Sequence, residues 1–336
     1  MHIMEEGFKE TVIPLKSRDE SSSVDYSNLP LTGQTFTEDS KRVGMVGIKI
    51  GMLPQWCQKR GERVLCTAIH FPSNEVISVV DPETWYRTNP VGKRKAYTRY
   101  GPMFKVTIGA GDLKSVLHMS PFDKVLMRRG INPKQHYGSF LVSEDGVIPP
   151  GTHLDVRHFN IGQFVNVAGR TIDWGFQGAM HRWGFRGQPD NRQVGSIFRS
   201  IGSKGDARVW PGKRLPGHMG HEWRQTSGLE ILRINPLAQV IYVKGCVPGS
   251  HGYPVLVNDC LNEEKRVKDP AFPTFAPEEE ENADLGQLSI GDLTSKDLYS
   301  EKLFQFNSSS IVFTEADEKK SAARDKTRAK IAKVKK

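Results

Sequence analysis

The stretch Glu230–Lys244, EILRINPLAQVIYVK, decides the fold class of this chain of 336 residues. Polar and apolar residues alternate with a period of two over Glu230–Asn235 and again over Val240–Lys244, as they do in strands that bury one face. Between these runs, Pro236–Gln239 contains a proline, which favours a turn. We therefore predict a β-hairpin at this place.

Further strands are predicted on both sides of the hairpin, where short apolar runs are bounded by turn residues. These runs are Val43–Ile50, Arg63–Phe71, Gln163–Ala168 and Val255–Val257. One short helix is predicted at Pro121–Arg129, because proline lies near its start and Gly130 follows its end. The 32 glycines and 20 prolines also favour short strands and many turns over long helices. The chain is therefore expected to be mainly β.

Both ends of the chain lack this pattern. Residues 1–41 are polar and without periodicity, so they are predicted to form an extended arm, and Met1–Lys16 shows no signal-peptide or transit-peptide pattern. Residues 263–336 are predicted to form a tail that is first acidic, at Glu278–Glu281, and then basic. Its last segment, Lys319–Lys336, contains nine Lys or Arg and one acid, a net charge of +8. Such a block favours contact with an anionic partner.

The segment Phe176–Arg224 concentrates the positive charge of the chain. It holds nine Lys or Arg and three acids, a net charge of +6 out of +9 for the whole chain, together with nine glycines. Its few apolar residues are mostly aromatic, so the segment cannot bury enough surface to fold by itself. Cations neutralise phosphates, glycine lets the main chain approach closely, and aromatic rings stack on unpaired bases. We predict an extension that is ordered by folded RNA, with a mobile basic loop as the alternative.

The residues predicted to contact RNA are the cations of this segment and three aromatic side chains that pack or stack. They are Arg182, Arg186, Arg192, Arg199, Lys204, Arg208, Lys213, Arg214 and Arg224, with Trp183, Phe185 and Trp210. Loss of one phosphate-contacting cation should weaken binding to RNA of any sequence. It should also lower the slope of log affinity against log salt concentration by roughly one.

Several motifs resemble those of the family called ribosomal protein L three. They are Gly175–Pro189 (GFQGAMHRWGFRGQP), Gly195–Ile197, Arg208–Gly220 (RVWPGKRLPGHMG) and Val243–Gly249 (VKGCVPG), preceded by Gly44–Met52 (GMVGIKIGM) and Gly151–Val167. The resemblance runs in order over roughly residues 43–260. Three short sequences are most similar to those of the mitochondrial branch of the family. They are Gly51–Trp56, His158–Gln163 and Arg208–Gly212. A chloroplast or bacterial origin is the alternative.

The resemblance implies a six-stranded β-barrel like that of translation factors. Residues 42–170 and 225–262 would form the barrel, with a helical insertion at about 84–150 and an rRNA-penetrating extension at 171–224. The implied function is that of a structural constituent of the mitochondrial large ribosomal subunit, in the matrix. It would bind large-subunit rRNA near the 3′ domain and the peptidyl-transferase centre and support assembly and translation. The implied partners are this rRNA and neighbouring large-subunit proteins, and the protein would not be a homo-oligomer.

The extension departs from the family pattern at three places. Asp173 and Trp174 stand where the family usually has Gly-Lys, which removes a cation and adds an anion. Pro189–Gly195 lacks the family's Ser-His-Gly and the following His-Arg, so the tip is about three residues shorter. Ser203 stands near the glutamine that is methylated in some bacterial relatives, so no such methylation is expected.

No catalytic site, cofactor or metal is predicted. Gly195–Lys204 lacks the spacing of a P-loop. His218–Glu222 contains two His and one Glu, but Gly217 and Gly220 disfavour the helix that would bring them together. The four cysteines include no Cys-x-x-Cys pair, so free thiols are expected. No run of 18 uncharged apolar residues occurs, so membrane insertion is not expected. The protein is not expected to be an enzyme, and the alternative functions are a free RNA chaperone or an RNA-modifying enzyme.

Overall fold

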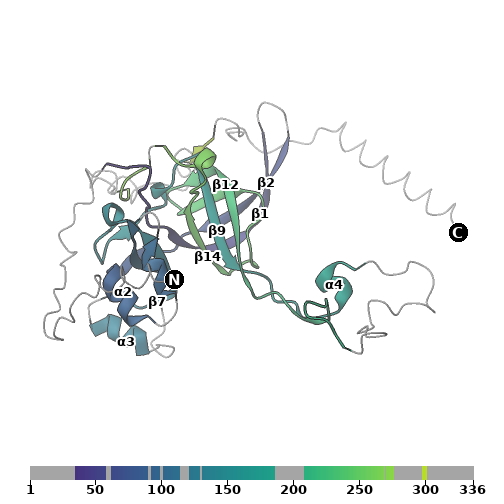
Figure 1. Ribbon diagram of the computed structural model, residues 1–336. Coiled ribbons are helices and arrows are strands. Elements are labelled where there is room, and N and C mark those ends of the chain that lie inside the picture. The colour runs from purple at the N-terminus through teal and green to yellow at the C-terminus, as the bar shows by residue number, and fades with distance from the viewer. Residues whose placement is uncertain are drawn as a thin grey trace, which may run out of the picture. The chain divides into compact units, whose positions relative to one another are not determined.

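The computed structural model describes nine parts of the chain. They are residues 35–57, 62–89, 92–98, 101–113, 121–128, 131–185, 208–268, 270–275 and 297–300. Within these parts the protein is mainly β, as the alternation of polar and apolar residues predicted, and its helices are few and short (Figure 1).

The larger sheet has seven strands. In the order of hydrogen-bonded neighbours they are β13 (Val240–Lys244), β2 (Arg63–His70), β1 (Met45–Trp56), β14 (Pro254–Asp259), β9 (Phe164–Arg170), β12 (Trp223–Asn235) and β15 (Leu298–Tyr299). β12 also pairs with β13, so six of these strands close into a ring. The pairings β1–β14, β14–β9, β9–β12, β12–β13 and β13–β2 are all antiparallel.

The predicted hairpin is confirmed as β12 and β13. Asn235 lies opposite Val240, and Ile231 lies opposite Val243. The side chains of Ile231, Ile241 and Val243 are completely buried, because the alternation places them on the inner face of the sheet.

The other predicted strands are confirmed as β1, β2, β9 and β14, and β12 begins earlier than predicted. Its first residues, Trp223–Thr226, lie in or beside the predicted extension and pair with β9, where Trp223 lies opposite Arg170. Trp223–Gln225 are exposed. These residues are therefore strand because the β9 ladder satisfies their backbone groups, although no apolar alternation marks them.

The chain between β2 and β9 builds a second, antiparallel sheet. Its four strands are, in order, β7 (Lys134–Val142), β6 (Phe104–Asp112), β3 (Asn74–Val80) and β8 (His153–Leu154). Two helices belong to the same part of the chain, α2 (Pro82–Thr88) and α3 (Pro121–Arg128). The helix predicted at Pro121–Arg129 is thus confirmed, and the segment at about 84–150 contains strands as well as helices.

Shorter elements connect these units. They are the 3₁₀ helices η2 (Lys93–Ala96), η4 (Glu144–Gly146), η5 (Val156–His158) and η6 (Glu263–Lys265), and the small strand pair β4 (Tyr97–Thr98) and β5 (Gly101–Pro102).

One apolar core joins the two sheets. Val106 and Ile108 of β6 belong to the same buried cluster as Met45 of β1. Within this cluster the rings of Phe71 and Phe159 lie with their centroids 6.0 Å apart. Since the two sheets share a core, the second sheet is part of the folded body.

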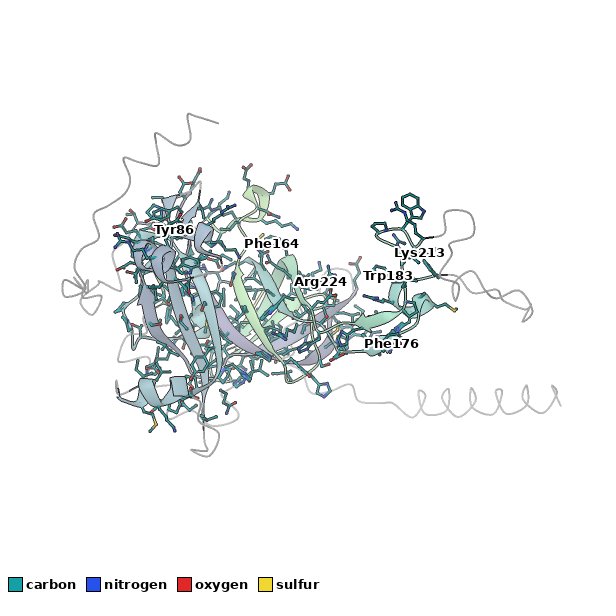
Figure 2. The ribbon with its side chains drawn as sticks, turned by 60° about the horizontal axis from the view of Figure 1, so that its bottom comes forward. Tyr86, Phe164, Phe176, Trp183, Lys213 and Arg224 are labelled. Atoms are coloured by element: carbon teal, nitrogen blue, oxygen red, sulfur yellow. The ribbon has the colours of Figure 1, made fainter. Side chains whose placement is uncertain are left out.

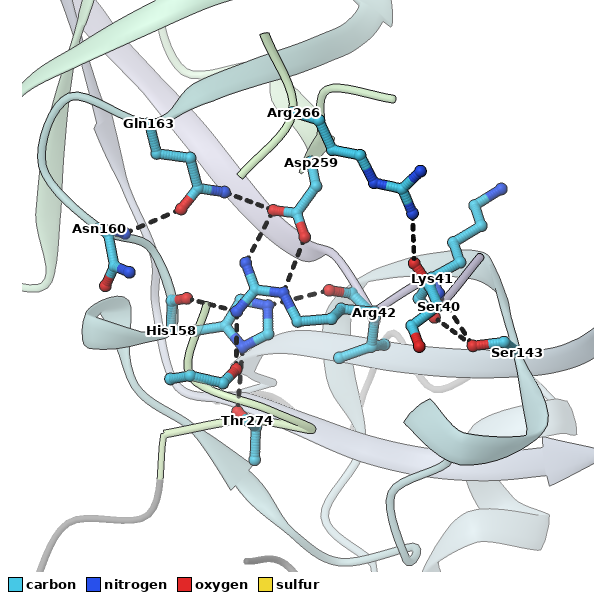
Figure 3. Close-up of polar contacts among 12 residues, drawn as sticks. Ser40, Lys41, Arg42, Ser143, His158, Asn160, Gln163, Asp259, Arg266 and Thr274 are labelled. Carbon is cyan, nitrogen blue, oxygen red and sulfur yellow. Dashed lines mark hydrogen bonds and ion pairs between the residues drawn. The ribbon is translucent and has the colours of Figure 1, made fainter. Parts of the chain in front are cut away.

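A buried polar network closes one side of this core (Figure 3). The guanidinium of Arg42 donates to both carboxylate oxygens of Asp259, at 2.8 and 2.9 Å. It also donates to the carbonyl oxygens of His158, at 2.9 Å, and Ala271, at 2.7 Å. The imidazole of His158 lies 3.1 Å from the hydroxyl of Thr274. The network therefore ties residues before β1 and residues after η6 to the ring.

Parts of the predicted terminal arm and tail contact the folded body. The backbone N–H of Lys41 donates to the hydroxyl of Ser143 at 2.8 Å, and Ser40 donates to the carboxylate of Asp145. The guanidinium of Arg266 donates to the carbonyl of Ser40 at 3.2 Å. The predicted boundaries at 41 and 263 stay predictions.

The chain divides into two units, and the described residues 54–57 and 62–64 belong to the second. In these residues, the backbone N–H of Cys57 donates to the carbonyl of Glu62 at 2.8 Å. Of all the helices in the described parts of the chain, none has the length and apolar character needed to cross a membrane.

A candidate nucleic-acid interface

A two-stranded ribbon continues from β9 and β12, and we call residues 171–185 and 208–222 the ribbon. The backbone N–H of Thr171 donates to the carbonyl of Glu222, and that of Trp174 donates to Met219, both at 2.9 Å. Further along, β10 (Gly175–Gln177) pairs with the antiparallel β11 (Gly217–Met219). The ladder of hydrogen bonds gives the ribbon a defined backbone without a core of its own.

Gly220 allows the two chains of the ribbon to approach closely. Its φ of +93° lies in the left-handed region, where residues with a side chain are strained. A Cβ atom at this position would also overlap the carbonyl oxygen of Ile172. Only glycine therefore fits here.

The helix α4 (Ala179–Trp183) is fixed to the returning chain by two side chains. Arg182 Nη1 and Trp183 Nε1 both donate to the carbonyl oxygen of Leu215, at 3.0 and 2.9 Å. The guanidinium of Arg182 also packs so closely on Gly217 that a Cβ there would overlap it. Arg182 was predicted to contact RNA, and within the chain it also has this structural role.

Three cations of the ribbon lie over tryptophan rings. The guanidinium carbon of Arg208 is 4.1 Å from the centroid of Trp210. Those of Arg182 and Arg214 are 5.0 and 5.8 Å from the centroid of Trp183. Trp183 is 41% exposed and Trp210 is 55% exposed, so both rings also present surface to solvent. The arrangement couples positive charge to planar surfaces.

Figure 2 shows Phe176, Trp183 and Lys213 in the outer part of the ribbon, and Arg224 nearer to the ring. Lys213 and Arg214 are exposed, and Phe185 is half-buried. Arg224 pairs with Glu222 at 3.0 Å, in an ion pair where both side chains are exposed. The remaining predicted cations, Arg186, Arg192, Arg199 and Lys204, lie outside the described residues.

Asp173, the acidic residue that departs from the family pattern, forms contacts within the ribbon. A carboxylate oxygen of Asp173 accepts from the backbone N–H of Gly175 at 2.8 Å and lies 3.0 Å from Nε2 of His218. The bond from Gly175, together with the imidazoles of His218 and His221, lowers the pKa of Asp173. Asp173 therefore bridges the two chains of the ribbon.

Sequence reasoning missed several exposed aromatic residues of this region. Phe176 is 77% exposed, Trp174 is 50% exposed and Trp223 is 57% exposed. The guanidinium of Arg170 lies 5.7 Å from the centroid of Trp223. The available signal was the presence of aromatic residues in strands too polar to bury them, inside the predicted segment for Phe176 and Trp223 and just before it for Trp174.

The described residues 171–185 and 208–224 carry an excess of positive charge. They include five Lys or Arg and two acids, which gives a net charge of +3. Both acids are engaged, Glu222 with Arg224 and Asp173 with His218. Arg208, Lys213 and Arg214 form no ion pair with a described carboxylate, so their charge is directed at solvent or a partner.

The His218–Glu222 motif is arranged as a strand end and a turn. His221 has a φ of +55°, and its Nε2 lies 2.6 Å from Nη1 of Arg170. In the described parts of the chain, no three His, Cys, Asp or Glu side chains are grouped as a metal site requires. The cysteines, Cys57, Cys66, Cys246 and Cys260, are free thiols, as predicted.

Comparison with known proteins identifies the family. Residues 144–239 match the family model of Ribosomal protein L3. The large ribosomal subunit protein uL3m of Arabidopsis thaliana is 34% identical over 264 residues, which cover 77% of this chain and 76% of the relative. The mainly β body and the ribbon, together with these matches, define a structural ribosomal protein and not an enzyme. The chain belongs to the ribosomal protein L3 family. The prediction of a large-subunit protein of mitochondrial type is confirmed.

Proposed function

We propose that this protein works in the mitochondrial large ribosomal subunit by binding large-subunit rRNA through its ribbon. The bound region is the RNA near the 3′ domain and the peptidyl-transferase centre, and the consequence of binding is subunit assembly. The protein shapes the RNA and takes no chemical step itself. Neighbouring large-subunit proteins are its other partners.

In this proposal the ring of six strands is a six-stranded β-barrel like that of translation factors. Residues 42–170 and 225–262 form it. The pairing of β12 with β13, which closes the sheet on itself, supports this. The insertion at about 84–150 is the second sheet with its helices. The extension at 171–224 grows from β9 and β12, whose ladder continues into the ribbon.

The observation that carries the proposal is the set of exposed cation–tryptophan pairs. Arg208 lies over Trp210 and Arg214 over Trp183, and neither arginine is neutralised by a described carboxylate. A guanidinium can bind phosphate while the adjacent ring stacks on a base, and such stacking contributes about 1–3 kcal/mol per base. Each phosphate contact also releases counterions.

The ribbon's backbone makes this surface suitable for RNA binding. Because β10 pairs with β11 and α4 is held to Leu215, the ring of Trp183 keeps its position before RNA binds. A surface that is arranged in advance loses less conformational entropy on binding.

Crosslinking and sequencing of RNA bound to the tagged protein in intact cells tests the proposal. We expect reads concentrated in the mitochondrial large-subunit rRNA, at the 3′ domain and near the peptidyl-transferase centre. The double variant Arg208→Glu/Arg214→Glu should lose the reads near the peptidyl-transferase centre. The variant Arg208→Lys/Arg214→Lys, which keeps the charges, should retain most of them. Reads spread over messengers and transfer RNAs would refute the proposal and favour a free RNA chaperone.

A further inference from the structure

A pocket of about 490 Å³ lies where the two sheets and the terminal segments meet. Its walls come from the residues before β1, from α2, η2, β6 and β7, and from β14 with the residues that follow it. The volume lies within the range of about 300–1,000 Å³ that is typical of small-ligand sites. The pocket is therefore large enough for one nucleotide.

Four cations line this pocket and are far apart in the sequence. They are Lys41, Lys95, Lys105 and Arg266. The acid among the lining residues, Asp259, is already neutralised by the completely buried side chain of Arg42. None of the four cations forms an ion pair with a carboxylate of the described residues. Among the described residues, the positive charge of the pocket is thus uncompensated.

Lys41 shows how closely these charges are placed. Burial and the nearby charge of Lys95 lower the pKa of the Lys41 ammonium. In Figure 3 the side chain of Lys41 extends away from the Arg42–Asp259 pair, so this carboxylate does not compensate it. Like charges held near each other in a partly buried site favour the binding of an anion.

The pocket also has aromatic walls. The ring of Phe36 lies 5.9 Å from the guanidinium of Arg266, and that of Trp85 lies 5.9 Å from the ammonium of Lys105. Aromatic side chains pack against the base of a nucleotide, which a bare phosphate ion lacks.

We propose that this pocket is a second RNA site, apart from the ribbon, which holds the phosphate and ribose of one nucleotide of the large-subunit rRNA. Lys41, Lys95, Lys105 and Arg266 neutralise the phosphate, and Phe36 and Trp85 border the rest of the nucleotide. The inference rests on the proposed function in that the bound nucleotide belongs to rRNA. The same chemistry exists in free nucleotides, which the experiment must separate from rRNA.

Lysine acetylation of the full chain, read by mass spectrometry, tests this inference. The chain is acetylated alone, with deproteinised large-subunit rRNA, with a nucleoside monophosphate, and within the assembled subunit. We expect the rRNA to reduce acetylation of Lys95 and Lys105 several-fold, and nuclease treatment to restore it. Lys124 of α3, which is exposed and lies outside the pocket, is the comparison in every arm.

Three other outcomes overturn the inference in different ways. Protection in the subunit without protection by rRNA means that a neighbouring protein covers the pocket. Protection by the monophosphate that equals protection by rRNA means that a free nucleotide is the ligand. Protection of Lys213 without protection of Lys95 and Lys105 refutes the pocket and leaves the ribbon proposal intact, whereas the reverse pattern refutes the ribbon alone.

A pair of matched variants gives an independent readout in solution. Lys95→Gln/Lys105→Gln should lower the slope of log affinity for rRNA against log salt by about two, since each lost phosphate contact lowers it by about one. Lys124→Gln/Lys244→Gln removes the same charge from sites outside the pocket and should leave the slope unchanged. Equal slopes for both variants and the wild type would overturn the inference, provided that near-ultraviolet circular dichroism shows all three folded.

Discussion

At the scale of single residues, His158 is the group whose protonation state the fold determines most strongly. Its Nε2 lies 3.0 Å from the carbonyl oxygen of Val43. Because a carbonyl can only accept, Nε2 carries the proton and Nδ1 accepts from the hydroxyl of Thr274. Burial, and then the charge of Arg42, lower the pKa of His158 well below its usual value of 6.5. The folded protein therefore contains the neutral imidazole.

This environment predicts a loss of stability in mild acid. The unfolded chain binds a proton at His158 below pH about 6.5, and the folded chain does not, so the free energy of unfolding falls as the pH drops below this value. The slope from this residue is at most about 1.4 kcal/mol per pH unit. Urea unfolding at several pH values between 7 and 5 measures the slope. His158→Gln should be less stable at pH 7 and show a smaller slope, and an unchanged slope would contradict the assignment.

The Arg42–Asp259 pair predicts a different pattern of stability loss. The Arg42 side chain is completely buried and that of Asp259 is 15% exposed, so removing either partner leaves a buried charge without compensation. Each single variant, Arg42→Ala or Asp259→Ala, should lose about 3–5 kcal/mol. The double variant should lose clearly less than the sum of the two. Denaturant unfolding of the four proteins in this cycle measures the difference, and strict additivity would show that the two charges do not interact.

Candidate RNA-contacting residues could be predicted from the sequence only where they are neighbours in it. Arg208 and Arg214 were predicted because charge, glycine and tryptophan occur together in one segment. Lys41, Lys95 and Lys105 lie in three separate segments, and only the meeting of two sheets brings them to one pocket. Periodicity describes which face a residue lies on, but it does not describe which distant segment faces it.

At the scale of elements, the ribbon depends on its glycines as much as on its cations. Gly220 has a left-handed backbone and lies against the carbonyl of Ile172. Gly178 has an ordinary φ of −67° and open space at its Cβ. The two glycines belong to the same element but have opposite tolerances for a methyl group.

Gly220→Ala should therefore separate the two chains of the ribbon, and Gly178→Ala should not. Hydrogen exchange of the full chain measures this at the amides of Thr171 and Trp174, which donate to Glu222 and Met219. We expect much faster exchange of both amides in Gly220→Ala and nearly unchanged exchange in Gly178→Ala. The amide of Ile231 in β12 is the internal control, since it lies in the ring. Equal protection in both variants would show that the ribbon does not need the close approach.

The elements themselves were predicted well where tertiary burial imposes alternation. The hairpin of β12 and β13 and the strands β1, β2, β9 and β14 all follow from period-two patterns. The start of β12 at Trp223 was not predicted, because its residues are strand through pairing with β9 and not through burial. The closure of six strands into a ring depends on long-range pairing, which local sequence does not encode.

At the scale of the whole molecule, the protein combines a body that has its own core with a ribbon that has none. The core cluster includes residues of both sheets, whereas the ribbon's tryptophans are exposed. Arg208 and Arg214 are exposed, and neither forms an ion pair with a carboxylate of the described residues. Changing them should therefore leave the stability of the body intact, since surface substitutions usually change it by less than about 0.5 kcal/mol.

Because the body and the ribbon are distinct, we predict that reversing charges on the ribbon prevents subunit assembly without affecting folding. Arg208→Glu/Arg214→Glu should fold with wild-type circular dichroism but should fail to enter large subunits in sucrose gradients, because two phosphate-directed cations have become anions. Arg208→Lys/Arg214→Lys should fold and assemble, with some loss of affinity because lysine lacks the planar guanidinium that stacks. If the charge-reversed protein assembles normally, the ribbon is not an RNA-binding element. If the lysine variant fails as completely as the glutamate variant, planar stacking contributes more than charge, and Trp183→Ala/Trp210→Ala should then reproduce the defect.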